Sequence, residues 1–405
     1  MHPEIFNKKY FYFSVLFIKI WTIFKFCIFG LHLEVIDVRI ITLSFIKYGG
    51  KMNGFYNGFD HVVIETPEER ESKRKKQRQL FSRVFLALFL FLILSQVLAE
   101  GVYFVASYIL SEEQYLAFAK SPVWAIIISC VIQYVIAFPV FLLALLKTDK
   151  SEKRDVSRLS GKDFVLLLCI GEALMFIGNL IGTLLNQTIG SLIGKLPEND
   201  ISTIISETPA WLIFICAVVI APIVEELIFR KLIIDRLSIY GDHIAIIFSA
   251  VAFGLMHGNL YQFFYATFLG VLLGYVYTKT RNVKYTIYMH MIINFLGSIV
   301  ALPVEKAMNE FYRLYEIALS GEAFDVLSLI FNGLIMLMYS NMQYGMIIGG
   351  VVALWYLFKK RELRVQTDKE IFLPDKEVIK GGVKNAGAIL FIVISIVSMI
   401  INLFT

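Results

Sequence analysis

Two adjacent acidic residues, Glu225 and Glu226, stand inside an apolar run of the sequence, and Arg230 follows one helical turn later. A carboxylate inside a membrane helix is costly and is rare without a partner or a chemical role. On a helix, Glu226 and Arg230 are four residues apart and can pair, whereas Glu225 is rotated by about 100° and points elsewhere. The spacing therefore predicts that one acid is structural and that the other is free for chemistry.

Two histidines lie in later apolar segments, and each shares a helical face with a residue four positions away. Phe253 precedes His257 in this way, and His290 precedes Asn294. If these residues converge with Glu225 in one apolar cavity, the cavity disfavours the charged carboxylate and suits it to take a proton from water. The amide of Asn294 beside an imidazole suits one of two roles, to bind a developing oxyanion or to fix the ring. The predicted chemistry is attack of an activated water on an amide, and no neighbouring serine or cysteine indicates a covalent route.

The composition places this chemistry in a membrane protein. The chain has 405 residues, of which 58% are hydrophobic and 18% charged, and its mean hydropathy is +0.69. Average soluble domains are about 45–50% apolar and about 25% charged. Runs of about 20 apolar residues predict an all-α polytopic transmembrane bundle of about 8–9 spans with an intramembrane cavity. The net charge of +5 is clustered in loops, where it sets orientation and does not indicate a nucleic-acid partner.

The chain divides into five predicted regions. No methionine occurs between Met1 and Met52, and the codons for the residues just before Met52 can encode a bacterial ribosome-binding site. We therefore expect residues 1–51 to be an extension ahead of the native start Met52, the alternative being an interfacial amphipathic anchor. The remaining predicted regions are a cytoplasmic basic segment 52–83, N-terminal transmembrane helices 84–160, a catalytic transmembrane core 161–302, and C-terminal transmembrane helices 303–405 with a basic cytoplasmic loop 359–384.

Three segments carry specific expectations. The positive-inside pattern places Glu225 and His290 near the cytoplasmic ends of their spans. For His257 to meet these two residues, the segment Ile244–His257 must not cross the bilayer fully, or the cavity must reach toward the membrane centre. Its length of only about 14 apolar residues permits an incomplete crossing. We expect an amphipathic helix outside the membrane at Glu305–Leu319. The segment Val326–Phe358 allows one net crossing, with one half partial, lateral or re-entrant.

Taken together, the three motifs resemble those of a known family. They read Glu225-Glu-Leu-Ile-Phe-Arg230, Phe253-Gly-Leu-Met-His257 and His290-Met-Ile-Ile-Asn294. Singly, each is as compatible with an ion pair or a packed polar contact. In this order, and all within apolar segments, they resemble the CPBP intramembrane glutamic endopeptidases, also called CAAX proteases and bacteriocin-processing or Abi proteins. The resemblance covers roughly residues 160–300.

The resemblance implies a multi-helix fold with a cavity in the membrane and a role for each motif residue. Glu225 would activate water with His257, and His290 and Asn294 would stabilise the oxyanion. The residues implied to support the site are Glu226, Arg230 and Phe253. It implies no cofactor and no metal ion.

The resemblance also implies a bacterial, multi-pass cell-membrane protein that cleaves a leader peptide or a membrane-protein substrate. The eukaryotic branch of the family cleaves prenylated tails, which bacteria generally lack.

Other functions remain open. The same fold could act without cleavage, as a bacteriocin-immunity protein or as a regulator that binds a membrane sensor kinase. A metal-dependent hydrolase would also use Glu and His, but no HExxH motif occurs and the histidines stand on separate predicted helices. A proton-coupled transporter would predict a repeated pair of broken helices, which the sequence does not show.

Overall fold

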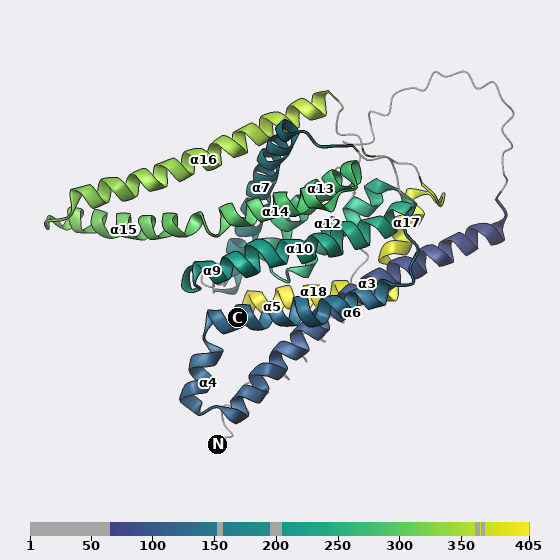
Figure 1. Cartoon of the computed structure of the whole chain (residues 1–405), viewed down its shortest axis with the longest axis horizontal. Helices are drawn as coiled ribbons and strands as arrows, with labels where there is room; N and C mark the ends of the chain where they lie inside the picture. Colours follow the sequence, from purple (N-terminus) through teal and green to yellow (C-terminus); the bar gives the residue numbers. More distant parts are fainter. Residues whose placement is uncertain (1–64, 152–156, 195–204, 361–364, 366–368, 405) are drawn as a thin grey trace. The chain divides into compact units, whose positions relative to one another are not determined.

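A computed structural model describes residues 65–151, 157–194, 205–360, 365 and 369–404 (Figure 1). All regular elements within these ranges are helical, and 8 helices are long and apolar enough to cross a membrane. The prediction of an all-α polytopic transmembrane bundle is confirmed, and the chain is a multi-pass membrane protein. The predicted extension 1–51 and the predicted start at Met52 lie outside the described residues.

The helices are grouped by their order along the chain into a first set that ends at residue 234 and a second set that follows it. The first set comprises α3 (Pro67–Ile109), α4 (Glu112–Ala119), α5 (Pro122–Cys130), the π-helix η1 (Val131–Ala137), α6 (Phe138–Leu145), α7 (Gly161–Ile193), α9 (Ala210–Ile213), the π-helix η2 (Phe214–Ile220), α10 (Ala221–Glu226) and the π-helix η3 (Leu227–Ile234). The second set comprises α11 (Asp235–Leu237), the 3₁₀-helix η4 (Ser238–Tyr240), α12 (Asp242–Met256), α13 (Leu260–Thr280), α14 (Val283–Gly297), α15 (Ala301–Ser320), α16 (Val326–Lys359), α17 (Asp375–Val383) and α18 (Ala386–Phe404).

Residues 67–83 of the predicted basic segment and the first span form one continuous helix, α3. Thr66 caps it, because its hydroxyl accepts from the Glu69 amide and the Glu69 carboxylate accepts from the Thr66 amide. Pro67 at the first helical position has no N–H that would need a partner. Residues 67–83 of the predicted basic segment are therefore the start of the first membrane helix.

The helix that carries the two acids is widened into π-helix on both sides of them. The segment η2 ends just before Pro222, and η3 begins directly after Glu226. Proline lacks the N–H that would continue an α-helical ladder, and π-helical turns inside α-helices are frequent at functional sites. Another π segment, η1, ends just before Pro139.

The helix α12 is too short to cross the membrane, as expected from its sequence. Its 15 residues span about 22 Å, less than the roughly 30 Å of a bilayer core. Gly241 at its start and Gly258 after its end both have positive φ, of 110° and 58°. The chain turns sharply after His257, so this residue lies at the C-terminal end of a helix that is shorter than the bilayer core.

The region after residue 300 corrects one prediction. The expected amphipathic helix at 305–319 is present as α15, but α16 is one unbroken helix of 34 residues. The expectation of a partial or re-entrant half within 326–358 is therefore wrong. This segment contains no proline, so nothing interrupts its backbone hydrogen bonds. Figure 1 shows α15 and α16 side by side as a helical hairpin.

Small residues allow α12 and α13 to approach closely. A Cβ atom at Gly270 of α13 would lie 2.9 Å from the Cα atom of Ala250 in α12, which real side chains do not tolerate. Small residues at helix contacts are the usual means of close packing in membranes. The largest buried hydrophobic cluster includes Phe253 of α12 together with residues of α3, α18 and η3. The partial span is thus held on several sides.

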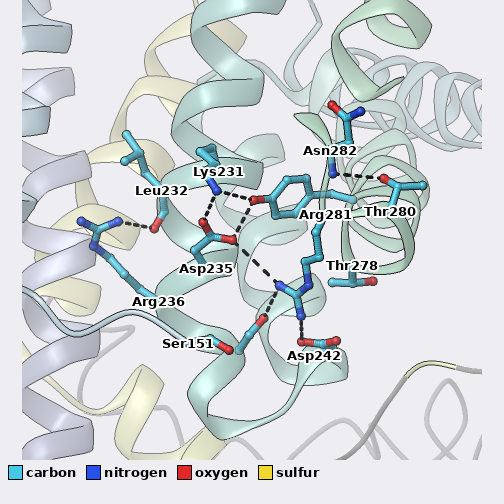
Figure 2. A network of polar contacts seen from close by, with 12 residues as sticks. Ser151, Lys231, Leu232, Asp235, Arg236, Asp242, Thr278, Thr280, Arg281 and Asn282 are labelled. Carbon is cyan, nitrogen blue, oxygen red and sulfur yellow. Dashed lines mark hydrogen bonds and ion pairs between the residues drawn. The ribbon is translucent and has the colours of Figure 1, made fainter. Parts of the chain in front are cut away.

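A polar network joins η3, α11 and α13 to the first residue of α12, at the end of α12 opposite to His257 (Figure 2). Asp235 accepts from the Tyr277 hydroxyl at 2.7 Å and pairs with the Lys231 ammonium at 2.7 Å. Arg281 donates to Asp242 at 2.7 Å and lies 3.9 Å from Asp235. These contacts fix the start of α12 relative to the helix that carries Glu225 and Glu226.

Candidate functional site

Glu226 and Arg230 form the predicted ion pair, and both side chains are fully buried. The Arg230 Nη1 atom lies 3.0 Å from Glu226 Oε1, without the angle of a hydrogen bond. The guanidinium instead stacks on Phe253, whose ring centroid lies 4.6 Å from its central carbon. Burying two charges is costly unless they are paired, and this pair meets that condition. Glu226 is therefore the structural acid of the two.

His290 of α14 lies between the two carboxylates. Its Nδ1–H donates to Glu226 Oε1 at 3.0 Å, and its Nε2 lies 3.8 Å from Glu225 Oε2. The His290 side chain is 4% exposed, whereas that of Glu225 is 20% exposed. Glu226 is thus occupied by two partners, and Glu225 is the more accessible acid.

Phe253 lies at the centre of the site. Its ring packs edge-on against His257, with centroids 4.9 Å apart, and against His290, with centroids 5.8 Å apart. The backbone carbonyl of Phe253 accepts a hydrogen bond of 2.8 Å from His257 Nδ1. Because a carbonyl only accepts, Nδ1 carries the proton and a neutral His257 ring has its lone pair on Nε2. His257 also interacts electrostatically with Glu225.

Asn294 lies one turn beyond His290 on α14, and its Nδ2 donates to the Ala217 carbonyl of η2 at 2.9 Å. The π pattern explains why this carbonyl is available. The Ala221 amide bonds to the Cys216 carbonyl, five residues back. The next donor in that pattern is Pro222, which has no N–H, so the Ala217 carbonyl is left for another donor. One of the two Nδ2 hydrogens of Asn294 remains for a substrate.

Two tyrosines that the sequence did not single out also approach Glu225. Tyr134 belongs to η1 and Tyr265 to α13, and both side chains are partly buried. Each interacts electrostatically with Glu225. Tyrosines are common in membrane helices, and no spacing connects these two to the acidic motif, so the sequence carried no signal for them.

The last helix of the chain also contacts the site. Asn402 of α18 donates through Nδ2 to the Gly258 carbonyl at 2.7 Å. Gly258 directly follows His257 and has a positive φ of 58°. In the sequence, Asn402 stands out only as a polar residue within an apolar helix. This position alone does not predict a contact with Gly258.

The donor atoms of the site are carboxylate and imidazole groups, which are also common metal ligands. Among the residues that the structure describes, no group of three or more His, Cys, Asp or Glu side chains is arranged to hold a metal ion. Cys130 and Cys216 lie near Tyr134 and are free thiols. The arrangement offers acid–base and hydrogen-bonding groups.

Known proteins match the part of the chain that contains these residues. Residues 207–296 match the family described as "Type II CAAX prenyl endopeptidase Rce1-like". All three motifs, from Glu225 to Asn294, lie within this segment. The family resemblance predicted from the motifs is thereby confirmed, and it supports a CAAX-type membrane protease at the level of the family.

Two curated relatives share parts of the sequence. The "Putative membrane peptidase YdiL" of Bacillus subtilis (strain 168) is 28% identical over 112 residues, which are 27% of this chain and 46% of the relative. The "UPF0177 protein YvdC" of Lactococcus lactis subsp. lactis (strain IL1403) is 25% identical over 173 residues, which are 42% of this chain and 66% of the relative. The chain thus spans about half to two thirds of the length of these relatives. No solved structure matches it.

Proposed function

We propose that this protein is an intramembrane endopeptidase that hydrolyses a peptide bond of a leader peptide or membrane-protein substrate. The observation that carries the proposal is the difference between the two adjacent acids. Glu226 is fully buried against Arg230 and His290, whereas Glu225 is partly exposed and has no hydrogen bond within the described residues. This difference supports Glu225 as the general base of the proposed reaction.

In this proposal Glu225 takes a proton from a water molecule, and the hydroxide attacks the carbonyl carbon of the substrate. The Nε2 lone pair of His257 accepts a second hydrogen of the same water and orients it. The Nε2 side of the His290 ring and the free hydrogen of Asn294 Nδ2 face the oxyanion of the tetrahedral intermediate in this proposal and stabilise it. The proton held by Glu225 passes to the leaving nitrogen as the C–N bond breaks, which gives a carboxylic acid and an amine.

The surroundings of the site support a substrate that is associated with the membrane. His257 ends the short helix α12, and the helices that carry Glu225 and His290 are long and apolar enough to cross a membrane. A substrate must therefore reach them from within the membrane or its surface. A hydrophobic leader peptide or a transmembrane segment meets this requirement.

The test is a comparison of strains that carry wild type, Glu225→Gln or the control Glu316→Gln in place of the native gene. Glu316 lies on α15 and is exposed, so its substitution removes one carboxylate away from the site. Mass spectrometry of membrane and secreted peptides should show a product that is lost only with Glu225→Gln. An unchanged peptide profile, with full function of the Glu225→Gln strain, would contradict cleavage. That result would favour the alternative in which the protein acts by binding a membrane partner.

A further inference from the structure

The outward face of α17 combines cationic and apolar side chains in two stripes. Lys376 and Lys380 are four residues apart and share one side of the helix, and Lys384 follows directly after its end. Ile379 and Val383, which are 45% and 43% exposed, form the adjacent line. A helix with lysines beside an apolar stripe is typical of a segment that lies in the membrane–water interface.

The inward face of α17 fixes this orientation. Val378 is fully buried, and its carbonyl accepts from Gln77 Nε2 of α3 at 2.9 Å. Gly381 and Gly382 are buried where a Cβ atom would collide with Gln77 and Phe81. The lysines therefore cannot turn inward, and they form no ion pair with any residue that the structure describes.

Two further cations lie on α3 beside its contact with α17. Gln77 and Phe81 mark the face of α3 that packs on α17. Lys76 and Arg78 are exposed and project about 100° to either side of Gln77. Neither has an ion pair within the described ranges. We call these two residues together with the outward face of α17 the basic surface.

The basic surface lies where a membrane boundary must be. The helix α18, which begins at Ala386 two residues after Lys384, is an apolar span of mean hydropathy 2.5. Ile379 and Val383 would be exposed to water if α17 extended away from the membrane. Placed in the interface, they reach the acyl boundary while the lysines stay at the level of the lipid phosphates.

We propose that the basic surface binds the headgroups of anionic membrane lipids. Several cations clustered next to a membrane span attract anionic lipid through the surface potential, and the effect is screened by salt. The interleaved apolar side chains favour a lipid surface over a nucleic acid, which would not cover them. The proposal does not depend on peptidase activity.

The experiment uses the full chain in nanodiscs of phosphatidylcholine alone or mixed with phosphatidylglycerol. The rate of acetylation of each lysine is measured by mass spectrometry. We expect acetylation of Lys376 and Lys380 to slow several-fold with phosphatidylglycerol and to recover in high salt. The internal controls are Lys120, which directly follows α4, and Lys306, which lies on α15. Both are exposed, and their acetylation rates should change little.

A pair of variants gives a second readout. Native mass spectrometry should show fewer phosphatidylglycerol molecules retained by Lys376→Gln/Lys380→Gln than by the charge-matched control Lys120→Gln/Lys306→Gln. Equal protection at the control lysines, or equal retention by the two variants, would overturn the proposal. Protection by inorganic phosphate or by an oligonucleotide in phosphatidylcholine discs, without any effect of phosphatidylglycerol, would also overturn it. The labelling of the wild-type chain remains decisive even where a variant folds poorly.

Discussion

His290 donates from Nδ1 to Glu226 Oε1 at 3.0 Å, while its Nε2 lies 3.8 Å from Glu225 Oε2. One imidazole ring therefore spans two adjacent acids that project from the same helix in different directions. The contact with Glu226 orients the ring, and the opposite nitrogen faces the more exposed acid. This arrangement separates a fully buried, paired carboxylate from a partly exposed one that we propose to be reactive, and the two should respond differently to the same substitution.

Glu226→Gln should reduce the free energy of unfolding by about 3–5 kcal/mol, because it leaves Arg230 as an unpaired buried cation. Glu225→Gln should leave stability nearly unchanged while it abolishes product formation. Unfolding in mixed detergent measures both. The double variant Glu226→Gln/Arg230→Met serves as the control, since removal of both charges should recover much of the loss. Equal stability of the two single variants would contradict the assignment of roles.

Asn294→Ala should slow formation of the peptide product about 100- to 1000-fold, because it removes the proposed donor to the oxyanion.

Pro222→Ala should slow formation of the peptide product less than Asn294→Ala does. The new amide of residue 222 can donate to the Ala217 carbonyl, which would release the Asn294 side chain from its anchor. Rates are measured on the product that Glu225→Gln abolishes. Wild-type rates in both variants would show that Asn294 is a packing residue.

The sequence predicted the local relationships of the site better than the distant ones. The pairing of Glu226 with Arg230 follows from helical periodicity, and the convergence of His290 on the acids followed from their shared apolar setting. The anchor of Asn294 could not be predicted, because it is a backbone carbonyl, that of Ala217, left without a donor by a proline in a π-helix. The pattern of side-chain types does not show which backbone carbonyl lacks a hydrogen-bond donor.

For the fold as well, the sequence predicted local features of single helices better than the course of the whole chain. The short span at α12 was predictable from its length, and α15 from its amphipathic pattern. The continuity of α16 was not recognised, because the alternation of loop charges allowed a broken segment. A helix of 34 residues spans about 51 Å and need not break if it tilts or extends beyond the bilayer. Loop charges constrain only the net number of crossings.

Glu377 joins α17 to two arginines of α3, and we expect this contact to be sensitive to acid. Its carboxylate accepts from Arg74 Nε at 2.9 Å and from Arg70 Nη2 at 2.5 Å. These hydrogen bonds, that of Arg74 foremost, lower the pKa of Glu377 from 4.5 to about 2. A depressed pKa in the folded state stabilises the fold fully above pH 4.5, and this stabilisation is lost as the pH falls from 4.5 towards 2.

We therefore expect the thermal midpoint of the wild type to fall more steeply below pH 4.5 than that of Glu377→Gln, which lacks the titrating group. Glu316→Gln should keep the wild-type pH dependence, because Glu316 is exposed and forms no ion pair with a basic residue in the described ranges. Parallel curves for wild type and Glu377→Gln would show that this carboxylate does not hold α17 in place.

Asn402→Leu should lower the rate of product formation roughly 10- to 100-fold with little change in the thermal midpoint. Asn402 holds the Gly258 carbonyl at 2.7 Å, and Gly258 forms the turn that directly follows His257. Small displacements of a catalytic group cost rate more than stability. The matched control is Asn341→Leu, since Asn341 donates only within its own helix, to the Leu337 carbonyl. The rate of His257 modification by diethylpyrocarbonate should change in Asn402→Leu alone. If both variants match the wild type in rate and in modification, α18 does not position the histidine.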